Sequence, residues 1–190
     1  AAVLQAASNI TQALLKREKD AGIVLAFSEV NSVGSTLIGG ESLDQALSLL
    51  ASGGADSVIV LENDLYRRAD TAAVDAALNA ASSVIVVDHQ QTATTDKAHW
   101  VLSAATFAEG DGTVISQEGR AQRYFQTFDA SYYDAAVLVK ESWRWLHALH
   151  STVDGKDVAW TLLDDAVAAT AAGIPALSVI GAAAPNAGFR

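Results

Sequence analysis

The sequence contains no cysteine among its 190 residues. This excludes a disulfide, a thiolate zinc site, a cysteine-ligated iron–sulfur cluster and a thiol nucleophile within the chain. Methionine is absent too, so Ala1 is not an uncleaved translation start, and we expect a processed protein or a piece of a longer one. Basic residues are scarce, with 12 against 22 acidic residues and a formal net charge of −10. Such an acidic balance argues against nucleic-acid binding, which depends on clustered Lys and Arg.

Proline occurs only twice, while Val, Ile and Leu are plentiful, and this composition argues against disorder. The length suits one domain, or one domain with an appendage. Residues 166–189 carry no charge, but they are mostly Ala, Gly, Ser and Thr. A membrane-spanning helix needs about 20 strongly apolar residues, so we predict no membrane span in this stretch.

Short apolar runs alternate with helical patterns in the first part of the chain. Four runs predict strands, the first three of them buried on both faces: Gly22–Phe27, Val58–Leu61, Val84–Val87 and Trp100–Leu102. A helix after the first run is predicted to begin with a capping box formed by Ser42 and Gln45. A second helix is predicted to begin at Asp70, with Val74, Ala77, Leu78 and Ala81 on its inner face.

This alternation predicts an α/β fold, with a Rossmann-like, doubly wound and mainly parallel sheet. Right-handed crossovers then bring the loops after the four strands to one edge of the sheet, which is where ligands of open α/β sheets bind. Ten charged residues occupy these loops: Glu29, Glu62, Asp64, Arg67, Arg68, Asp88, Asp96, Lys97, Glu109 and Asp111. They fit an active site, a set of interface ion pairs or a solvated rim, and composition alone does not choose among these.

The pattern changes after Leu102. Asp111-Gly112 predicts a hairpin turn, and a long helix is expected to begin at Asp134. A second helix is predicted over Val158–Ala172, followed by a short strand over Ala176–Ile180 and a linker. We therefore divide the chain into an α/β domain, residues 1–133, and a helical pair with a C-terminal linker, residues 134–190.

Three kinds of chemical site were tested against the sequence. The stretch Gly34–Ser42 has the glycine spacing of a phosphate-binding loop, but Gly40 stands where the lysine is needed. The serine-hydrolase motif G-x-S-x-G is absent. His147 and His150, near Asp154 and Asp157, could hold a metal or could be ordinary positions of an amphipathic helix. We predict no catalytic, cofactor-binding or metal-ligating residue in this chain.

The segment Ala98–Gln122 resembles the signature of the molybdopterin oxidoreductase superfamily. The resemblance lies in Ala104-Ala105, Glu109, Gly112-Thr113 and Glu118-Gly119-Arg120. Thr94 and Asp96 precede it, and Asn31–Gly34 is similar to the Asn-rich loop that follows an earlier strand of the family. Departures occur at His99, Ser103 and Ser116-Gln117, which replace an aspartate, a proline and an Asn/Thr pair.

Within that superfamily, the segment 105–113 and the C-terminal residues 174–190 resemble the large iron–sulfur subunits of bacterial NADH:quinone oxidoreductases, respiratory complex I. This resemblance implies a C-terminal fragment that has lost the pterin and the metal and keeps the fold as a scaffold. It implies 2Fe–2S and 4Fe–4S clusters in the parent subunit and none here. Implied partners are the rest of the subunit and other peripheral-arm subunits, on the cytoplasmic side of the inner membrane.

Eleven residues are expected to serve structural or interdomain contacts: Asn31, Gly34, Asp64, Asp88, Asp96, Glu109, Asp111, Gly112, Glu118, Gly119 and Arg120. Charge-assisted hydrogen bonds of Glu109, Glu118 and Arg120 are expected to hold the hairpin against the sheet. Two alternatives stay open. One is a domain of a genuine molybdopterin-dependent formate or nitrate oxidoreductase, and the other is an independent α/β module that binds a small molecule.

Overall fold

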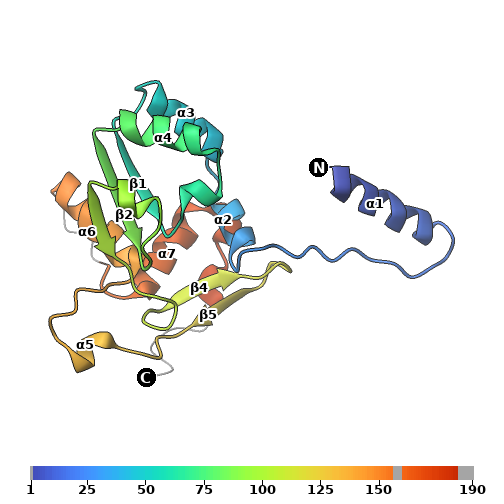
Figure 1. The fold of residues 1–190 in the computed structure, drawn as a ribbon. Coiled ribbons are helices and arrows are strands. Elements are labelled where there is room, and N and C mark those ends of the chain that lie inside the picture. Colours follow the sequence, from blue (N-terminus) through green and yellow to red (C-terminus); the bar gives the residue numbers. More distant parts are fainter. Residues whose placement is uncertain (1, 156–159, 184–190) are drawn as a thin grey trace.

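The computed structural model describes residues 2–155 and 160–183. Three α-helices come first along the described chain, the strands and one more α-helix occupy its middle, and three further α-helices follow (Figure 1). The α-helices are α1 (Ala2–Leu15), α2 (Ser32–Ile38), α3 (Leu43–Ala51), α4 (Thr71–Ala80), α5 (Ala130–Tyr133), α6 (Ser142–Asp154) and α7 (Leu163–Gly173). The strands are β1 (Ser57–Leu61), β2 (Ser83–Asp88), β3 (Trp100–Ser103), β4 (Gly112–Ile115) and β5 (Ala121–Tyr124). Short 3₁₀ turns are η1 (Leu65–Arg67), η2 (Thr95–Lys97), η3 (Pro175–Leu177) and η4 (Ile180–Ala182).

The centre of the fold is a parallel sheet with strand order β1-β2-β3. Successive side chains of a strand point to opposite faces of its sheet. Val84 and Val86 of β2 point to the same face and join the core formed with α3 and α4. Helix α6 also lies close to β2. The predicted α/β fold with a parallel sheet is thereby confirmed.

Local signals place α3 and α4. Ser42 and Gln45 form the predicted capping box, with Gln45 N–H donating to Ser42 Oγ and Ser42 N–H donating to Gln45 Oε1. The Asp70 side chain accepts hydrogen bonds from Ala72 N–H and Ala73 N–H in the first turn of α4. The four residues predicted for the inner face of this helix are all buried. The two helices pack on one another and on β1 and β2.

A second, smaller core lies below the sheet. The antiparallel hairpin β4–β5 packs against α2, and α7 packs against η3 and η4. Ile115, Leu177 and Ile180 are its buried residues. The predicted strand over Ala176–Ile180 is wrong, because Pro175 begins a 3₁₀ turn and two such turns carry the apolar side chains into this core.

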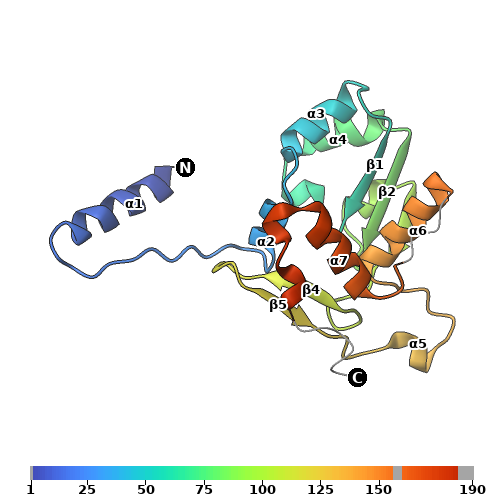
Figure 2. The same ribbon diagram turned by 180° about the vertical axis from the view of Figure 1, so that it is seen from behind.

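The N-terminal part forms an arm. Figures 1 and 2, which view the molecule from opposite sides, both show α1 apart from the rest of the fold. The predicted strand Gly22–Phe27 is wrong: this segment has no strand partner among the described residues, and Val24 is 83% exposed. The apolar run has the pattern of a buried strand, but a strand forms only where another strand can pair with it. Residues 22–27 lie in the arm, where no described strand is beside them.

The long helix predicted to begin at Asp134 is also wrong at its start. Helix α6 begins at Ser142, because the preceding backbone is extended and pairs with the end of β3. Ala105 N–H donates to Lys140 O at 2.8 Å, and Lys140 N–H donates to Ser103 O at 3.3 Å. Gly155, at φ 63°, ends α6 in the left-handed conformation that glycine adopts readily.

The second predicted helix begins later than expected, at Leu163, where Asp165 accepts hydrogen bonds from Thr161 N–H and Leu162 N–H. Residues 158 and 159 of that prediction lie outside the described residues, as does the predicted linker from residue 184 onward. The division at residue 133 stays a prediction. In the part of the chain that the structure describes, no helix is long and apolar enough to cross a membrane.

Candidate functional site

The loops after β1 and β2 meet at the carboxyl edge of the sheet, as the parallel topology predicts. Asp64 caps η1 and accepts a hydrogen bond from Tyr66 N–H at 3.3 Å. Thr94, which is fully buried, donates its hydroxyl hydrogen to Asp64 Oδ1 at 2.8 Å. The same hydroxyl accepts a hydrogen bond from Leu65 N–H at 2.8 Å. One side chain therefore ties two loops together through two hydrogen bonds.

A cleft of about 560 Å³ opens beside these loops, and Asp88, Asp96 and Glu109 are among its lining residues. Each of the first two carboxylates has a local donor. Asp88, at the end of β2, accepts from Gln90 N–H at 3.0 Å, and Asp96 accepts from the Gln91 side-chain amide at 2.9 Å. These bonds shape the turn after β2.

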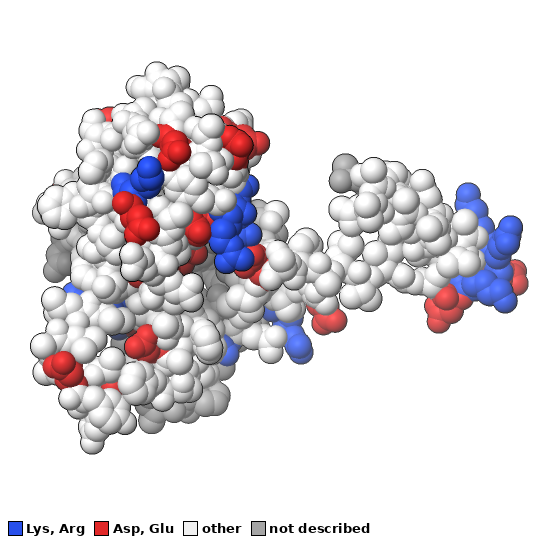
Figure 3. Space-filling view, viewed as in Figure 1, with Lys and Arg blue, Asp and Glu red and all other residues white. Residues whose placement is uncertain are grey.

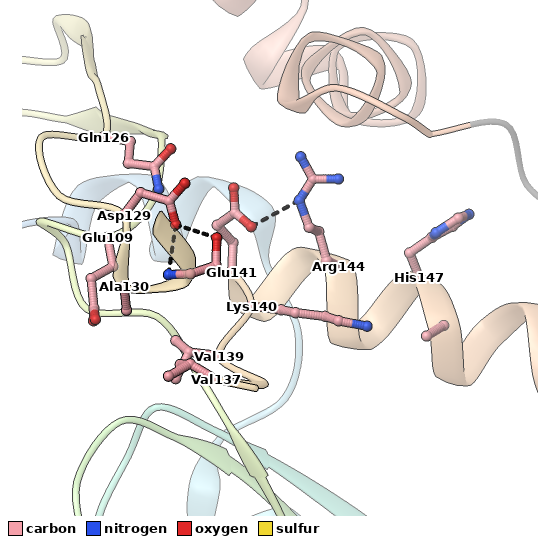
Figure 4. Close-up of a pocket in the computed structure, with 12 residues that line it drawn as sticks. Glu109, Gln126, Asp129, Ala130, Val137, Val139, Lys140, Glu141, Arg144 and His147 are labelled. Atoms are coloured by element: carbon pink, nitrogen blue, oxygen red, sulfur yellow. Dashed lines mark hydrogen bonds and ion pairs between the residues drawn. The ribbon is translucent and has the colours of Figure 1, made fainter. Parts of the chain in front are cut away.

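Glu109 lies between this cleft and a neighbouring one of about 520 Å³, which Figure 4 shows. It accepts hydrogen bonds from Thr106 N–H at 3.0 Å and from Thr106 Oγ1 at 2.8 Å. The backbone hydrogen bond is the largest cause that lowers the pKa of Glu109, followed by the hydroxyl. The carboxylate is therefore held ionised by its own turn and does not act as an acid poised near neutral pH.

The second cleft mixes acidic and basic side chains. Arg144 pairs with Glu141 through Nε–Oε2 at 2.8 Å (Figure 4). Lys140 Nζ lies 4.8 Å from the centre of the Trp145 ring. Asp129 accepts from Ser131 Oγ and Ser131 N–H, and these bonds lower the pKa of Asp129. The charged groups of both clefts thus have partners that fix local structure, and they form no nucleophile–base pair among the described residues.

Asn31 and Gly34 come together at the start of α2. Asn31 Oδ1 accepts a hydrogen bond from Ile115 N–H at 2.9 Å, which joins α2 to β4. A Cβ at Gly34 would lie 2.2 Å from the same oxygen. Glycine at position 34 therefore leaves the space that the Asn31 side chain occupies.

The hairpin turn is not at Asp111-Gly112, which corrects the sequence prediction. Gly112 is the first residue of β4, and a Cβ there would lie 2.1 Å from the Tyr124 ring. Asp111 is buried and accepts from Gln126 N–H at 2.6 Å. The chain reverses instead around Gly119, whose φ of 80° suits glycine.

The expected charge-assisted bonds of the hairpin are also wrong. Glu109 binds Thr106 and does not reach the hairpin. Glu118 and Arg120 are exposed at the hairpin tip, where their backbone N–H groups donate to Ser116 Oγ. Whether the eleven predicted residues serve contacts between domains stays a prediction.

Two polar contacts between residues far apart in the sequence could not be predicted from it. Arg123, whose side chain is 2% exposed, pairs with Asp164 at 2.7 Å and so joins β5 to α7. Trp145 Nε1 donates to Ser103 O at 2.8 Å. The partners are about forty residues apart in each case, so no local pattern could reveal them.

The histidines form no metal centre in the described residues. His150 lies 3.2 Å from Asp154, and His147 stacks on Trp160. Asp157 is outside the described residues. Across residues 2–155 and 160–183, no group of three or more His, Asp or Glu could hold a metal ion.

Comparisons with known proteins agree with the signature. The family model "Molybdopterin oxidoreductase" matches residues 1–151. The chain is 58% identical over 189 residues to the G subunit of the NADH-quinone oxidoreductase of Pseudomonas fluorescens. It is 54% identical to the corresponding G subunits of Pseudomonas putida, over 189 residues, and Escherichia coli K12, over 188.

These matches cover 99–100% of this chain but 21% of each relative. The chain therefore spans about a fifth of the length of the curated relatives it matches. The resemblance drawn from Ala98–Gln122 is confirmed by both comparisons. The match of the family model over most of the chain shows that this protein belongs to the molybdopterin oxidoreductase family.

Proposed function

We propose that this chain is a non-catalytic structural domain of the large iron–sulfur subunit of an NADH:quinone oxidoreductase. The parent complex would transfer electrons from NADH to quinone and couple this transfer to proton translocation. The names of the relatives support the proposal. The absence of cysteine supports a placement of the 2Fe–2S and 4Fe–4S clusters in the parent subunit outside this chain.

The observation that carries the proposal is the uncovered apolar surface of the N-terminal arm. Helix α1 has no buried residue, and its exposed side chains include Val3, Leu4 and Ile10. A free helix of 14 residues is marginal in water, because most helical stability in proteins comes from packing an apolar face. The arm therefore requires another protein surface.

We propose the rest of its own subunit as the surface that covers the arm, with neighbouring peripheral-arm subunits as further partners. We also propose that the domain lies on the cytoplasmic side of the bacterial inner membrane, as part of a peripheral arm. The carboxylates at the sheet edge support a scaffold role, because Asp64, Asp88 and Glu109 each accept a backbone N–H hydrogen bond from their own loop. No observation favours a formate or nitrate oxidoreductase over this assignment.

The test replaces the matching segment of the Pseudomonas fluorescens subunit with this chain, because the two are 58% identical. The chimeric complex should assemble and oxidise NADH with quinone as acceptor. The variant Leu4→Ser/Ile10→Ser should reduce assembly, whereas Gln5→Ser, on the same exposed helix, should not. Stoichiometric iron or molybdenum in the purified chain, measured by elemental analysis, would overturn the proposal.

A further inference from the structure

A cluster of aromatic side chains lies exposed on the loop around α5. We call Phe128, Tyr132 and Tyr133 the aromatic loop. Tyr132 is 83% exposed, Tyr133 is 75% exposed and Phe128 is 45% exposed. The rings contact each other: Phe128 and Tyr133 stack with centroids 5.6 Å apart, and Tyr132 meets Tyr133 edge to face at 5.2 Å. The rings thus form one surface, not separate exposed residues.

The structure holds this loop in place. Thr127 N–H and Phe128 N–H both donate to Ala108 O at 2.9 Å. Asp129 accepts from Ser131 N–H and caps the single turn of α5. The aromatic rings are therefore presented with their backbone already ordered, which lowers the entropy cost of binding.

The loop projects from the fold, away from the sheet and from α1 (Figures 1 and 2). The surface around it in Figure 3 is mostly uncharged, with acidic atoms at its margin. Asp129 lies between Phe128 and Tyr132 in the sequence, Asp134 follows Tyr133, and both aspartates are exposed. Contiguous exposed aromatic residues with a polar rim are the composition of a protein-binding hot spot, in which Tyr offers an apolar ring and a hydroxyl.

We propose that the aromatic loop docks into an apolar groove, rimmed by Lys or Arg, on the part of the same subunit that lies outside this chain. The inference rests on the proposed function. The matched relatives are about five times longer than this chain, so most of such a subunit is available to supply the groove. The basic rim complements Asp129 and Asp134.

The four tyrosines of the chain allow a direct test. Nitration with tetranitromethane, read by peptide mass spectrometry, is compared among the purified chain, the chimeric full-length subunit and the assembled chimeric complex. Tyr66 is the internal reference, because its O–H donates to Asp75 at 2.6 Å and burial raises its pKa to about 12. Tyr132 and Tyr133 should react readily in the chain and fall to the level of Tyr66 in the full-length subunit.

The other results overturn the inference. Equal nitration in the chain and the full-length subunit excludes docking within the subunit. Protection that begins only in the assembled complex assigns the groove to another subunit. Protection in the isolated chain, with a dimer in sedimentation, assigns it to a second copy, and protection by anionic phospholipid vesicles assigns it to a membrane surface.

Substitutions give a second measurement. Tyr132→Ser/Tyr133→Ser in the full-length subunit should increase proteinase K cleavage around α5, whereas Val153→Ser, at a residue 83% exposed on α6, should leave cleavage around α5 unchanged. If the chimeric complex is active and its two tyrosines stay reactive, the inference fails and the proposed function stands. If the chimera with an intact loop does not assemble, both fail.

Discussion

We predict that the two hydrogen bonds of the Thr94 hydroxyl contribute substantially to the stability of the fold at the carboxyl edge of the sheet. Thr94→Val keeps the shape of the side chain and removes the hydroxyl, which joins the loops after β1 and β2. The substitution loses the hydrogen bond to the Asp64 carboxylate and leaves Leu65 N–H without its acceptor. Thr94 is fully buried and Leu65 is 8% exposed, so water does not readily replace these bonds.

The cost follows from the two losses. A hydrogen bond to a charged group contributes about 1.5–3 kcal/mol, and a buried unsatisfied donor costs about 1–3 kcal/mol. The added methyl group recovers roughly 1 kcal/mol. We expect Thr94→Val to lower the free energy of unfolding by about 1.5–5 kcal/mol. For a chain of this size each kcal/mol shifts Tm by about 2–4 °C, so Tm should fall by roughly 3–20 °C.

Urea unfolding followed by circular dichroism measures this change. Thr152→Val is the matched control, because Thr152 is exposed and its hydroxyl donates only to Ala148 O within α6. The control should stay within about 0.5 kcal/mol of the parent chain. A Thr94→Val variant that unfolds at the same urea concentration as this control would refute the reasoning.

Two substitutions and one titration test other contacts. Gly112→Ala should destabilise the hairpin by about 1–3 kcal/mol, as overpacking does, because the added methyl group meets the Tyr124 ring; urea unfolding measures it. The hydrogen bonds from Thr106 lower the pKa of Glu109 below its ordinary value of 4.5, so their contribution to stability is lost as the pH falls through the pKa of the folded state. Glu109→Gln should therefore lower the free energy of unfolding at pH 7 and weaken its decrease below pH 4.5. Tyr66 should ionise only near pH 12 in an absorbance titration, because burial raises its pKa, and its stabilising contribution should be lost as pH rises through that value.

Each of these has its own control. Gly173→Ala adds a methyl group where nothing lies within 4 Å, and it should be tolerated; equal losses at both glycines would contradict the packing argument. Glu118→Gln, at the exposed hairpin tip, should leave the stability at pH 7 unchanged. Tyr66→Phe should remove the absorbance step near pH 12, and its persistence would mean that another tyrosine produces it.

The sequence predicts best where local signals and burial agree. Helix α4 has Asp70 at its start and a regular inner face, and β2 has a continuous run of Val and Ile, so both are confirmed within a residue or two. The meeting of the loops that carry Asp64 and Asp88 follows from parallel topology. Their signals are local in the sequence, although β2 pairs with a strand on each side.

The failures have a common physical cause. Gly22–Phe27 has the composition of a strand, but no neighbouring strand among the described residues pairs with it. The helical pattern after Asp134 is overridden because Lys140 pairs with the end of β3. The pairing of Arg123 with Asp164 depends on a fold that brings β5 to α7. In all three cases the local structure depends on a partner far away in the sequence, and a short stretch of sequence does not reveal that partner.

The length of the arm also limits how far α1 can move from the rest of the fold. Between α1 and α2 lie residues 16–31, and a fully extended segment of this length spans at most about 55 Å. Once α1 is bound to a partner, the remainder of the fold is confined to a small volume around it, so a second contact becomes an intramolecular event with a high effective concentration. Two individually weak attachments, one at α1 and one elsewhere on the fold, can therefore give a long-lived assembly without fixing the angle between them.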